Sequence, residues 1–428
     1  MLQWIESVNQ FLHPLLWGWP VLSAILLAGA NLTIRSGFFQ FTHCILWIKT
    51  TFCILFRHQK ASKEGISPLQ ALTTALAGSI GTGNIVGVAT ALTIGGPGAI
   101  FWMWISALFG MMTIFAENVL GMKYRVKNEK GEWQGGAMYY IHRGIHCRPL
   151  ALVFAGACVL ASLGMGNMAQ SNSIAGALQF AVAPKWVGLT VAILLLWVSF
   201  GGMRRTAKVT EKLVPFMAIG YLIACTVVLI ANHAVLPHVF SQIFSEAFNL
   251  QSVAGGAGGS IMLRAMQCGI SRGIFTNEAG LGTSVMAHTS SNGTEPVEQG
   301  MWGIFQIFID TILMCTVTAL CILSSGTLSS GKDGAELSAA AFASVFGPWG
   351  NWIVSICITL FAFATMLAWC CYGERSLTYL TGGKGVFCYR ILFAAAAFFS
   401  CGMAVSYTHL DVYKRQGPTR AYIFPLRL

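Results

Sequence analysis

An interrupted apolar run between Leu69 and Ile94 holds the residues best suited to bind a solute. Its centre, from Ala77 to Gly87, has four glycines in eleven residues, and each glycine costs about 1 kcal/mol relative to alanine inside a helix. In a bilayer every backbone N–H and C=O group still needs a partner. Two interpretations are open: close helix packing through small residues, or a broken helix whose free backbone groups line a cavity and bind a solute.

A second apolar run, at residues 261–290, is interrupted in a similar way. Glycines at 255–259 lead into it, and glycines follow together with Arg272, Asn277 and Glu278. Polar residues inside a membrane span face a bundle interior or a wet cavity. A pair of interrupted spans in corresponding positions indicates a secondary transporter built from inverted repeats.

The acidic residues within or near the apolar runs have more ordinary interpretations. Structural pairing is favoured for Asp310 and for Glu278, the latter with Arg272, although a gate role is an alternative. Glu117 and Glu211 lie near the ends of runs, where snorkelling is expected. An intramembrane enzyme would need a nucleophile with a base, or paired aspartates. The sequence shows neither, so we expect no enzyme and no catalytic residue.

The composition indicates a polytopic membrane protein. Of 428 residues, 55% are hydrophobic and only 10% are charged, against about 25% charged in soluble domains. The mean hydropathy is +0.66. The net charge of +11 does not indicate nucleic-acid binding, because the lysines and arginines are concentrated in the loops between the apolar runs. The 13 cysteines are scattered without zinc-binding spacing, so we interpret them as small buried hydrophobic residues.

Ten apolar runs are long enough to be spans. Their approximate limits are 15–34, 68–94, 99–121, 150–182, 186–203, 213–231, 261–290, 301–324, 350–373 and 386–405. If the N-terminus lies outside, the inner loops hold 18 lysines and arginines and the outer loops hold two. The positive-inside rule therefore supports both the count and an outer N-terminus. Residues 38–56 suit an interfacial helix, and 335–346 suit a short external helix.

The two interruptions lie five runs apart, and a repeat with an odd number of helices must be inverted. We expect one transporter domain, 1–405, with a first repeat at 68–231 and an incomplete second repeat at 261–405. After Val405 the composition becomes polar and mixed. We therefore expect 406–428 to be a non-native tail and the complete protein to have about 11 spans.

Four motifs are similar to those of the sodium:alanine symporter family, also called the alanine or glycine:cation symporters. They are Gly-Thr-Gly-Asn at 81–84, the segment from Gly95 to Gly110, Gly-Asn-Met-Ala-Gln at 166–170 and Thr-Asn-Glu-Ala-Gly-Leu-Gly at 276–282. The resemblance covers about residues 15–405. One departure is Ala137, where many members have proline.

The resemblance implies an all-α, leucine-transporter-type fold with one extra N-terminal helix. It implies import of alanine or glycine coupled to Na⁺ by alternating access, with H⁺ coupling, or a channel, as the alternatives. No organic cofactor is expected. The expected setting is a monomer in the plasma membrane of a prokaryote, with a small neutral amino acid and the lipid bilayer as its partners and no nucleic acid.

The same resemblance points to particular binding residues. Half-helix N-termini suit the carboxylate of an amino acid, while hydroxyl and carbonyl oxygens suit Na⁺ as they suit other hard cations. Trp369 has an alternative interpretation as an interfacial residue. The expected substrate-binding residues are Thr82, Gly83, Asn84, Gly164, Gln170, Phe275, Thr365 and Trp369. The expected Na⁺ ligands are Ala77, Ile80, Gly81 and Thr365.

Overall fold

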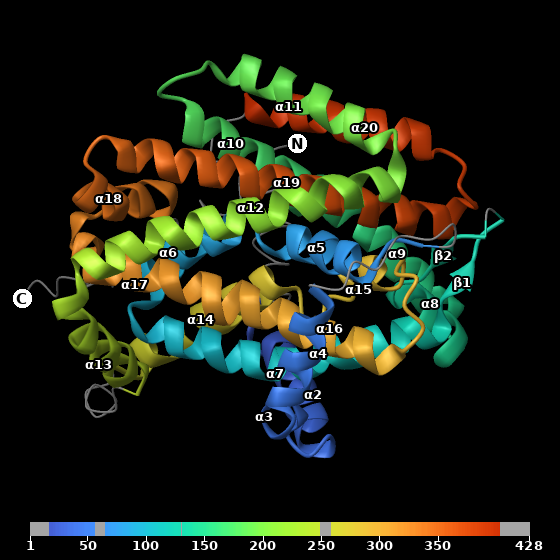
Figure 1. Ribbon diagram of the computed structural model, residues 1–428, viewed down its shortest axis with the longest axis horizontal. Coiled ribbons are helices and arrows are strands. Elements are labelled where there is room, and N and C mark those ends of the chain that lie inside the picture. Colours follow the sequence, from blue (N-terminus) through green and yellow to red (C-terminus); the bar gives the residue numbers. More distant parts are fainter. Residues whose placement is uncertain (1–16, 56–64, 130, 249–257, 403–428) are drawn as a thin grey trace, which may run out of the picture.

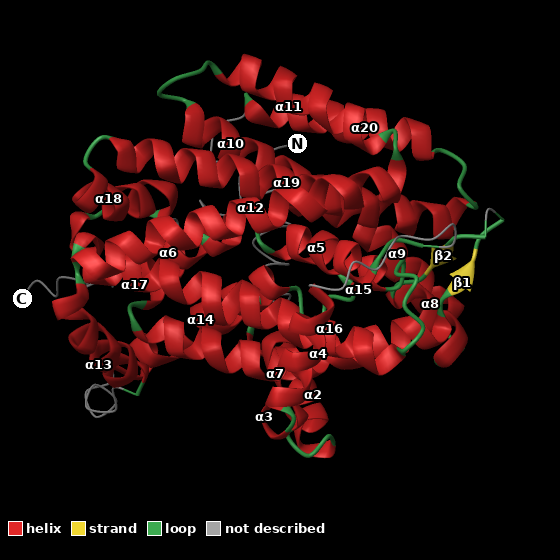
Figure 2. Ribbon diagram, viewed as in Figure 1, coloured by secondary structure: helices red, strands yellow, loops and turns green. Residues whose placement is uncertain are grey.

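The computed structural model describes residues 17–55, 65–129, 131–248 and 258–402. Over these residues the chain is almost entirely helical, as Figure 2 shows. The one sheet in this part of the chain is a short antiparallel hairpin of β1 (Val126–Lys127) and β2 (Trp133–Gln134). The predicted tail at 406–428 lies outside the described residues.

Each of the ten predicted apolar runs contains a helix. The helices are α2 (Trp19–Arg35), α3 (Phe39–Thr42), α4 (Cys44–Leu55), α5 (Pro68–Ser79), η1 (Thr82–Asn84), α6 (Val86–Gly95), α7 (Gly98–Tyr124), α8 (Ala137–Gly144), α9 (Arg148–Leu163), η2 (Gly164–Met168), α10 (Ala169–Leu178), α11 (Pro184–Ser199), α12 (Gly202–Ala231), η3 (His233–Val235), α13 (Leu236–Ala247), α14 (Gly258–Asn277), α15 (Val285–His288), α16 (Pro296–Ile307), η5 (Phe308–Cys315), α17 (Thr316–Ser324), η6 (Thr327–Ser330), α18 (Gly334–Phe346), α19 (Trp349–Thr381) and α20 (Val386–Cys401).

Five helical stretches among the described residues are long and apolar enough to cross a membrane. They are α7, α9 to α10, α12, α16 to α17, and α19. The apolar helices α2, α6, α11, α18 and α20 are shorter. Large apolar side chains such as Leu27, Leu160, Phe216 and Trp349 are exposed on the outer surface, which suits contact with lipid rather than with water.

The first interruption is a real break in a helix. α5 begins at Pro68 behind a capping box, in which Ser67 and Gln70 satisfy each other's backbone N–H groups. The helix ends at Ser79, and Gly81 is extended, with φ −129° and ψ −155°. One short turn, η1, precedes α6. The broken-helix interpretation of this run is therefore confirmed for the backbone.

The second interruption is also confirmed. α14 ends at Asn277, and Glu278 has a φ of +58°, which is unusual for any residue except glycine. Gly280 and Gly282 follow with φ of +85° and +67°, so irregular backbone continues to the short helix α15. The irregular segment from Glu278 to Ser284 is buried except around Gly280 and Leu281.

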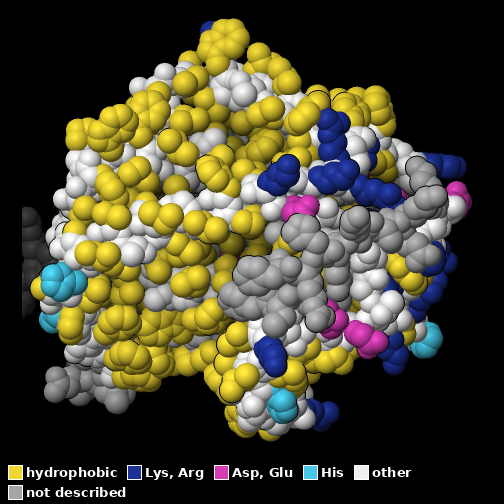
Figure 3. Space-filling model, viewed as in Figure 1, with side chains coloured by type: hydrophobic (Ala, Val, Ile, Leu, Met, Phe, Trp, Pro, Cys, Tyr) yellow, Lys and Arg dark blue, Asp and Glu magenta, His cyan; other side chains and the backbone are white. Residues whose placement is uncertain are grey.

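The broken helices lie in the middle of the molecule. In Figure 1, α5 and α6 lie between α12 and α19 on one side and α7, α14 and α16 on the other. α11 and α20 pack side by side at one edge, outside α10 and α19. Figure 3 shows that lysine and arginine side chains gather toward the end that carries β1, β2 and the turn between α19 and α20.

Several elements differ from the prediction or extend it. Residues 38–55, the described part of the segment predicted at 38–56, hold two helices, α3 and α4, because Phe38 adopts a left-handed conformation ahead of the first and His43 separates them. The predicted short helix at 335–346 is confirmed as α18. The amphipathic helices α8 and α13 were not predicted. Neither were the π-helical turns η2 and η5, each inside a span that had been expected to be regular.

Candidate functional site

The two helix breaks meet at a small central cavity of about 10 Å³. This is room for about one water molecule. Its walls come from α5 and η1, the π-turn η2 and α10, the end of α14, and the middle of α19. The lining residues are Gly78, Ser79, Gly81, Gly83, Met165, Gln170, Phe275, Thr276, Glu278, Thr365 and Trp369.

Five of the eight predicted substrate-binding residues line this cavity: Gly83, Gln170, Phe275, Thr365 and Trp369. They come from four separate helical elements, so their meeting at one place is a property of the fold. Thr82 lies directly beside the wall, where its hydroxyl donates to Oε1 of Gln170 at 3.0 Å. Trp369 is 2% exposed, which excludes its alternative interpretation as an interfacial residue.

Asn84 is fully buried but is not among the lining residues of the central cavity. Its Nδ2 donates to the backbone oxygen of Asp310 at 3.0 Å and to Oδ1 of Asp310 at 2.8 Å. Its own Oδ1 accepts from the N–H of Gly81 at 3.0 Å. Asn84 therefore holds the broken backbone to η5, and it satisfies an amide freed by the break.

Gly164 does not reach the central cavity. It is exposed, and no atom lies within 4 Å of the position that a Cβ would occupy there. Two residues further along the same π-turn, a Cβ on Gly166 would overlap Cβ and Cγ of Trp369. Met165 is the residue of this turn that lines the central cavity. The resemblance therefore pointed to the correct turn, while the π-helical geometry decides which of its residues face inward.

The predicted Na⁺ ligands lie close together on the wall formed by α5 and α19. The Thr365 hydroxyl is 3.4 Å from the Ile80 carbonyl oxygen and also donates to Phe361 at 3.0 Å. A Cβ on Gly81 would lie only 2.6 Å from the Thr365 oxygen, so a side chain there would displace it. Ala77 is fully buried one turn before Ile80. Hydroxyl and carbonyl oxygens at one point fit a hard monovalent cation.

The acidic groups near the cavity correct two interpretations made from the sequence. Glu278 is not paired with Arg272: its Oε2 accepts from the Thr283 hydroxyl at 2.7 Å, and its Oε1 is buried without a hydrogen-bond partner. Glu117 does not reach an interface. Its Oε2 is buried, and its carboxylate accepts from backbone N–H groups of the irregular segment after α14.

Two further polar contacts concern the remaining acidic residues. Asp310 is fully buried and accepts from Asn84 and from the Thr311 hydroxyl at 2.8 Å. This neutral pairing replaces the ionic partner that a mid-span aspartate was expected to need. Glu211 accepts from Nε2 of Gln70 at 2.9 Å, so it links α12 to the first turn of α5.

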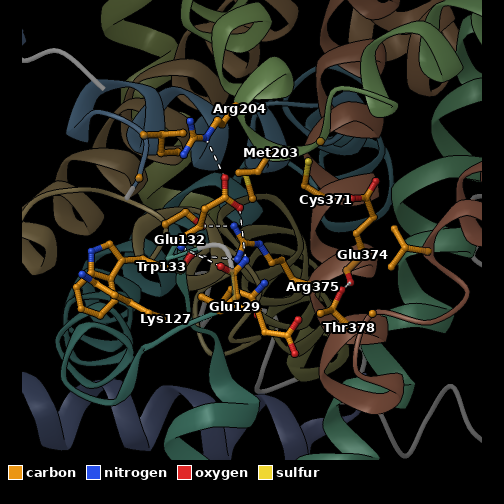
Figure 4. A pocket seen from close by; sticks show the side chains of 18 of the residues that line it. Lys127, Glu129, Glu132, Trp133, Met203, Arg204, Cys371, Glu374, Arg375 and Thr378 are labelled. Carbon is orange, nitrogen blue, oxygen red and sulfur yellow. Dashed lines mark hydrogen bonds and ion pairs between the residues drawn. The ribbon is translucent and has the colours of Figure 1, made fainter. Parts of the chain in front are cut away.

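A second, larger cavity of about 720 Å³ opens at the basic end of the molecule. Figure 4 shows Glu132 beside Arg204 on one wall, and Glu374, Arg375 and Thr378 of α19 on another. Arg204 pairs with Glu132 at 3.0 Å. Two hydrogen bonds, at 2.6 and 2.8 Å, join Arg390 on α20 to Glu374.

The segment after the second interruption is tied to the start of the first broken helix at this same end. Ile66 donates to Ser290 at 3.0 Å and accepts from the N–H of Asn292 at 2.8 Å. Arg125 donates to the carbonyl oxygens of Ser291 and Gly293 at 2.6 and 2.8 Å. These contacts hold the two interrupted helices together on the basic side of the central cavity.

Comparison with known proteins gives a consistent result. Residues 2–411 match the model of the sodium:alanine symporter family. The chain is 41% identical over 405 residues to the sodium/alanine symporter AgcS of Methanococcus maripaludis, covering 92% of this chain and 87% of that protein. It is 41% identical over 394 residues to an uncharacterized transporter of Haemophilus influenzae, covering 91% and 86%. It is 34% identical over 409 residues to the probable sodium/glutamine symporter GlnT of Bacillus subtilis, covering 94% and 83%.

Proposed function

The chain belongs to the sodium:alanine symporter family, and we propose that it imports alanine or glycine together with Na⁺ by alternating access. The observation that carries this proposal is the meeting of both helix breaks at one buried cavity. A zwitterion is costly to place in a low-dielectric core. The backbone N–H and C=O groups freed by the two breaks offer positive partial charges to its carboxylate and negative ones to its ammonium group.

The carboxylate of the amino acid is assigned to the backbone at Thr82 and Gly83. This segment leads into the N-terminus of α6, where N–H groups and the positive end of the helix dipole favour an anion. The hydrogen bond from the Thr82 hydroxyl fixes the orientation of the Gln170 side-chain amide, which lines the same cavity. Phe275 and Trp369 close the cavity around a small side chain, which favours alanine or glycine over larger amino acids.

The Na⁺ ion is assigned to the oxygens of Ile80 and Thr365, with Ala77 and Gly81 beside them. The ion then bridges the broken helix and α19, and it orders the same backbone that receives the amino acid. Coupling requires that both solutes favour the same conformation through differential affinity. Binding of Na⁺ next to Gly81 meets this requirement, because Gly81 also lines the central cavity.

The proposed architecture has two inverted repeats, 68–231 and 261–405, within one transporter domain at 1–405. The breaks in α5–α6 and after α14 support it, since each lies in the first span of its proposed repeat. The N-terminus is assigned to the outside and the basic end to the inside. The 720 Å³ cavity is then the inner vestibule, which the tied segments at Ile66 and Ser290 separate from the central cavity.

Uptake into proteoliposomes tests the proposal. Purified full-length protein should accumulate labelled alanine when Na⁺ is present outside and should not do so in choline buffer. Excess unlabelled alanine or glycine should compete. Flux that is independent of any gradient would indicate a channel instead. Accumulation driven by a pH gradient in the absence of Na⁺ would support the H⁺-coupled alternative.

A further inference from the structure

Glu278 is the one acidic residue that lines the central cavity within the part of the chain that the structure describes. It is 1% exposed. None of the described lining residues is a lysine, an arginine or a histidine. A buried carboxylate without a cation is strongly unfavourable. A ligand that brings a positive charge to this wall would stabilise the ionised form of Glu278, which otherwise takes up a proton.

The backbone position of Glu278 increases this cost. The residue directly follows the end of α14, where its N–H donates to Ile274 at 3.0 Å, and its φ is +58°. Glycine is the usual residue at such a helix end, because it has no Cβ to strain. A side chain kept in a strained conformation at a cavity wall indicates a functional role rather than a packing role.

The electrostatics of the helix end act in the same direction. The C-terminus of α14 carries the negative end of the helix dipole and free carbonyl groups. A carboxylate at this end is repelled by the dipole, so Glu278 adds negative charge where the helix already supplies it. The combined site is a strong cation acceptor that faces the solute cavity.

The contacts of the carboxylate leave one oxygen for a ligand. Oε2 accepts from the Thr283 hydroxyl at 2.7 Å. Oε1 is buried and has no hydrogen-bond partner. The Trp369 side chain, which lines the same cavity, lies close enough to interact with this carboxylate, so a ligand at Oε1 would lie beside the indole. Thr283 thus orients the carboxylate by one oxygen and leaves the other available.

We propose that Oε1 of Glu278 binds the α-ammonium group of the transported amino acid, together with the last carbonyl groups of α14. This inference rests on the proposed function, and it names the group that recognises the amino end of the substrate. In the solute-bound state the cavity must be larger than its volume of about 10 Å³ in this structure, and the solute then reaches from the backbone at Gly83 to the end of α14. Amino acids are distinguished from simple carboxylic acids by this contact.

The test compares alanine with propionate, which is the same molecule without the ammonium group. Equilibrium binding to the purified full-length protein is measured at saturating Na⁺. The wild-type protein should prefer alanine over propionate. Glu278→Gln should reduce this preference by roughly tenfold or more, since a hydrogen bond between two charged groups is lost. The affinity for propionate should remain unchanged.

Two matched variants separate ligand recognition from a structural role. Thr283→Val removes the partner of Oε2 but keeps the charge of Glu278, so it should reduce the preference for alanine by less than Glu278→Gln does. Glu336→Gln changes an exposed glutamate on α18 and should leave both affinities at their wild-type values. If Glu278→Gln does not fold, Glu278→Asp is measured instead; its shorter carboxylate should weaken alanine binding alone.

Three results would overturn the inference. One is an unchanged preference for alanine in Glu278→Gln, and another is an equal loss of affinity for both ligands. The third is a loss of the preference in Thr283→Val equal to that in Glu278→Gln. A wild-type protein that binds neither alanine nor any other small amino acid in Na⁺ contradicts the proposed function itself. If it binds glycine instead, glycine and acetate replace the first pair of ligands.

Discussion

At the scale of single residues, Gly166 and Gly164 offer a matched pair on one π-turn. Gly166→Ala places a Cβ against the Trp369 side chain, and overpacking of this kind costs about 1–3 kcal/mol. We expect it to displace the indole from the central cavity and to reduce alanine uptake severalfold. Uptake into proteoliposomes and the melting temperature of the purified protein provide the measurements.

Gly164→Ala is the control for this prediction. The position has open space around it, and alanine is the better helix former, so uptake should stay near the wild-type rate. A large loss of uptake in Gly164→Ala, with normal uptake in Gly166→Ala, would contradict the geometry and favour the prediction for Gly164 that the resemblance implied.

The Thr365 hydroxyl is expected to contribute to Na⁺ binding. Thr365→Val keeps the shape of the side chain but removes an oxygen that lies 3.4 Å from the Ile80 carbonyl. We expect the Na⁺ concentration for half-maximal uptake to rise by roughly tenfold, the equivalent of one hydrogen bond to a charged group. Thr365→Ser retains the oxygen and should behave nearly as the wild type does. Equal Na⁺ dependence in both variants would exclude this hydroxyl as a ligand.

Residue types in the sequence located most of the cavity wall, but they could not give side-chain direction. Asn84 was correctly expected beside the break, yet its amide turns toward Asp310. Glu278 was expected to pair with Arg272, and the structure leaves one of its oxygens free. Both outcomes depend on backbone torsion angles within the breaks, which no periodic pattern of residue types specifies.

At the scale of elements, the Arg125 side chain joins the end of α7 to the segment after α15. We expect Arg125→Ala to loosen that segment, because the guanidinium donates to two of its carbonyl groups at 2.6 and 2.8 Å. Hydrogen exchange at the amides of Ile66 and Asn292 should accelerate by roughly tenfold, equivalent to about 1.4 kcal/mol of local opening.

Lys123→Ala is the control for this substitution. Lys123 is exposed on the last turn of the same helix, and its only described contact is with the ring of the adjacent Tyr124. Exchange at the two amides should not change. Equal acceleration in both variants would mean that the loss of positive charge, rather than the loss of these hydrogen bonds, opens the segment.

The apolar runs predicted the existence of the spanning elements, and glycine content predicted where two of them break. Hydrophobic runs could not show the π-turns η2 and η5, because one extra residue in a turn leaves the overall hydropathy unchanged. α13 was missed for a different reason. Its polar and apolar residues alternate at helical spacing over only 12 residues, which is shorter than a span.

At the scale of the whole molecule, the distribution of charge predicts the orientation in the membrane. Lys127→Cys, at the basic end, and Ser330→Cys, in η6, are labelled with a membrane-impermeant thiol reagent, and the modified peptides are identified by mass. In intact cells only Ser330→Cys should react; in inverted vesicles only Lys127→Cys should. The opposite pattern would place the N-terminus inside.

The small size of the central cavity has a consequence for the electrical properties of the membrane. A space of about 10 Å³ holds about one water molecule, so it cannot contain a continuous file of water along which protons would hop. In this state the central cavity therefore offers protons no water-filled path between the described helices that surround it. The cell can therefore keep many copies in its membrane without short-circuiting the voltage and ion gradients that drive its other transporters.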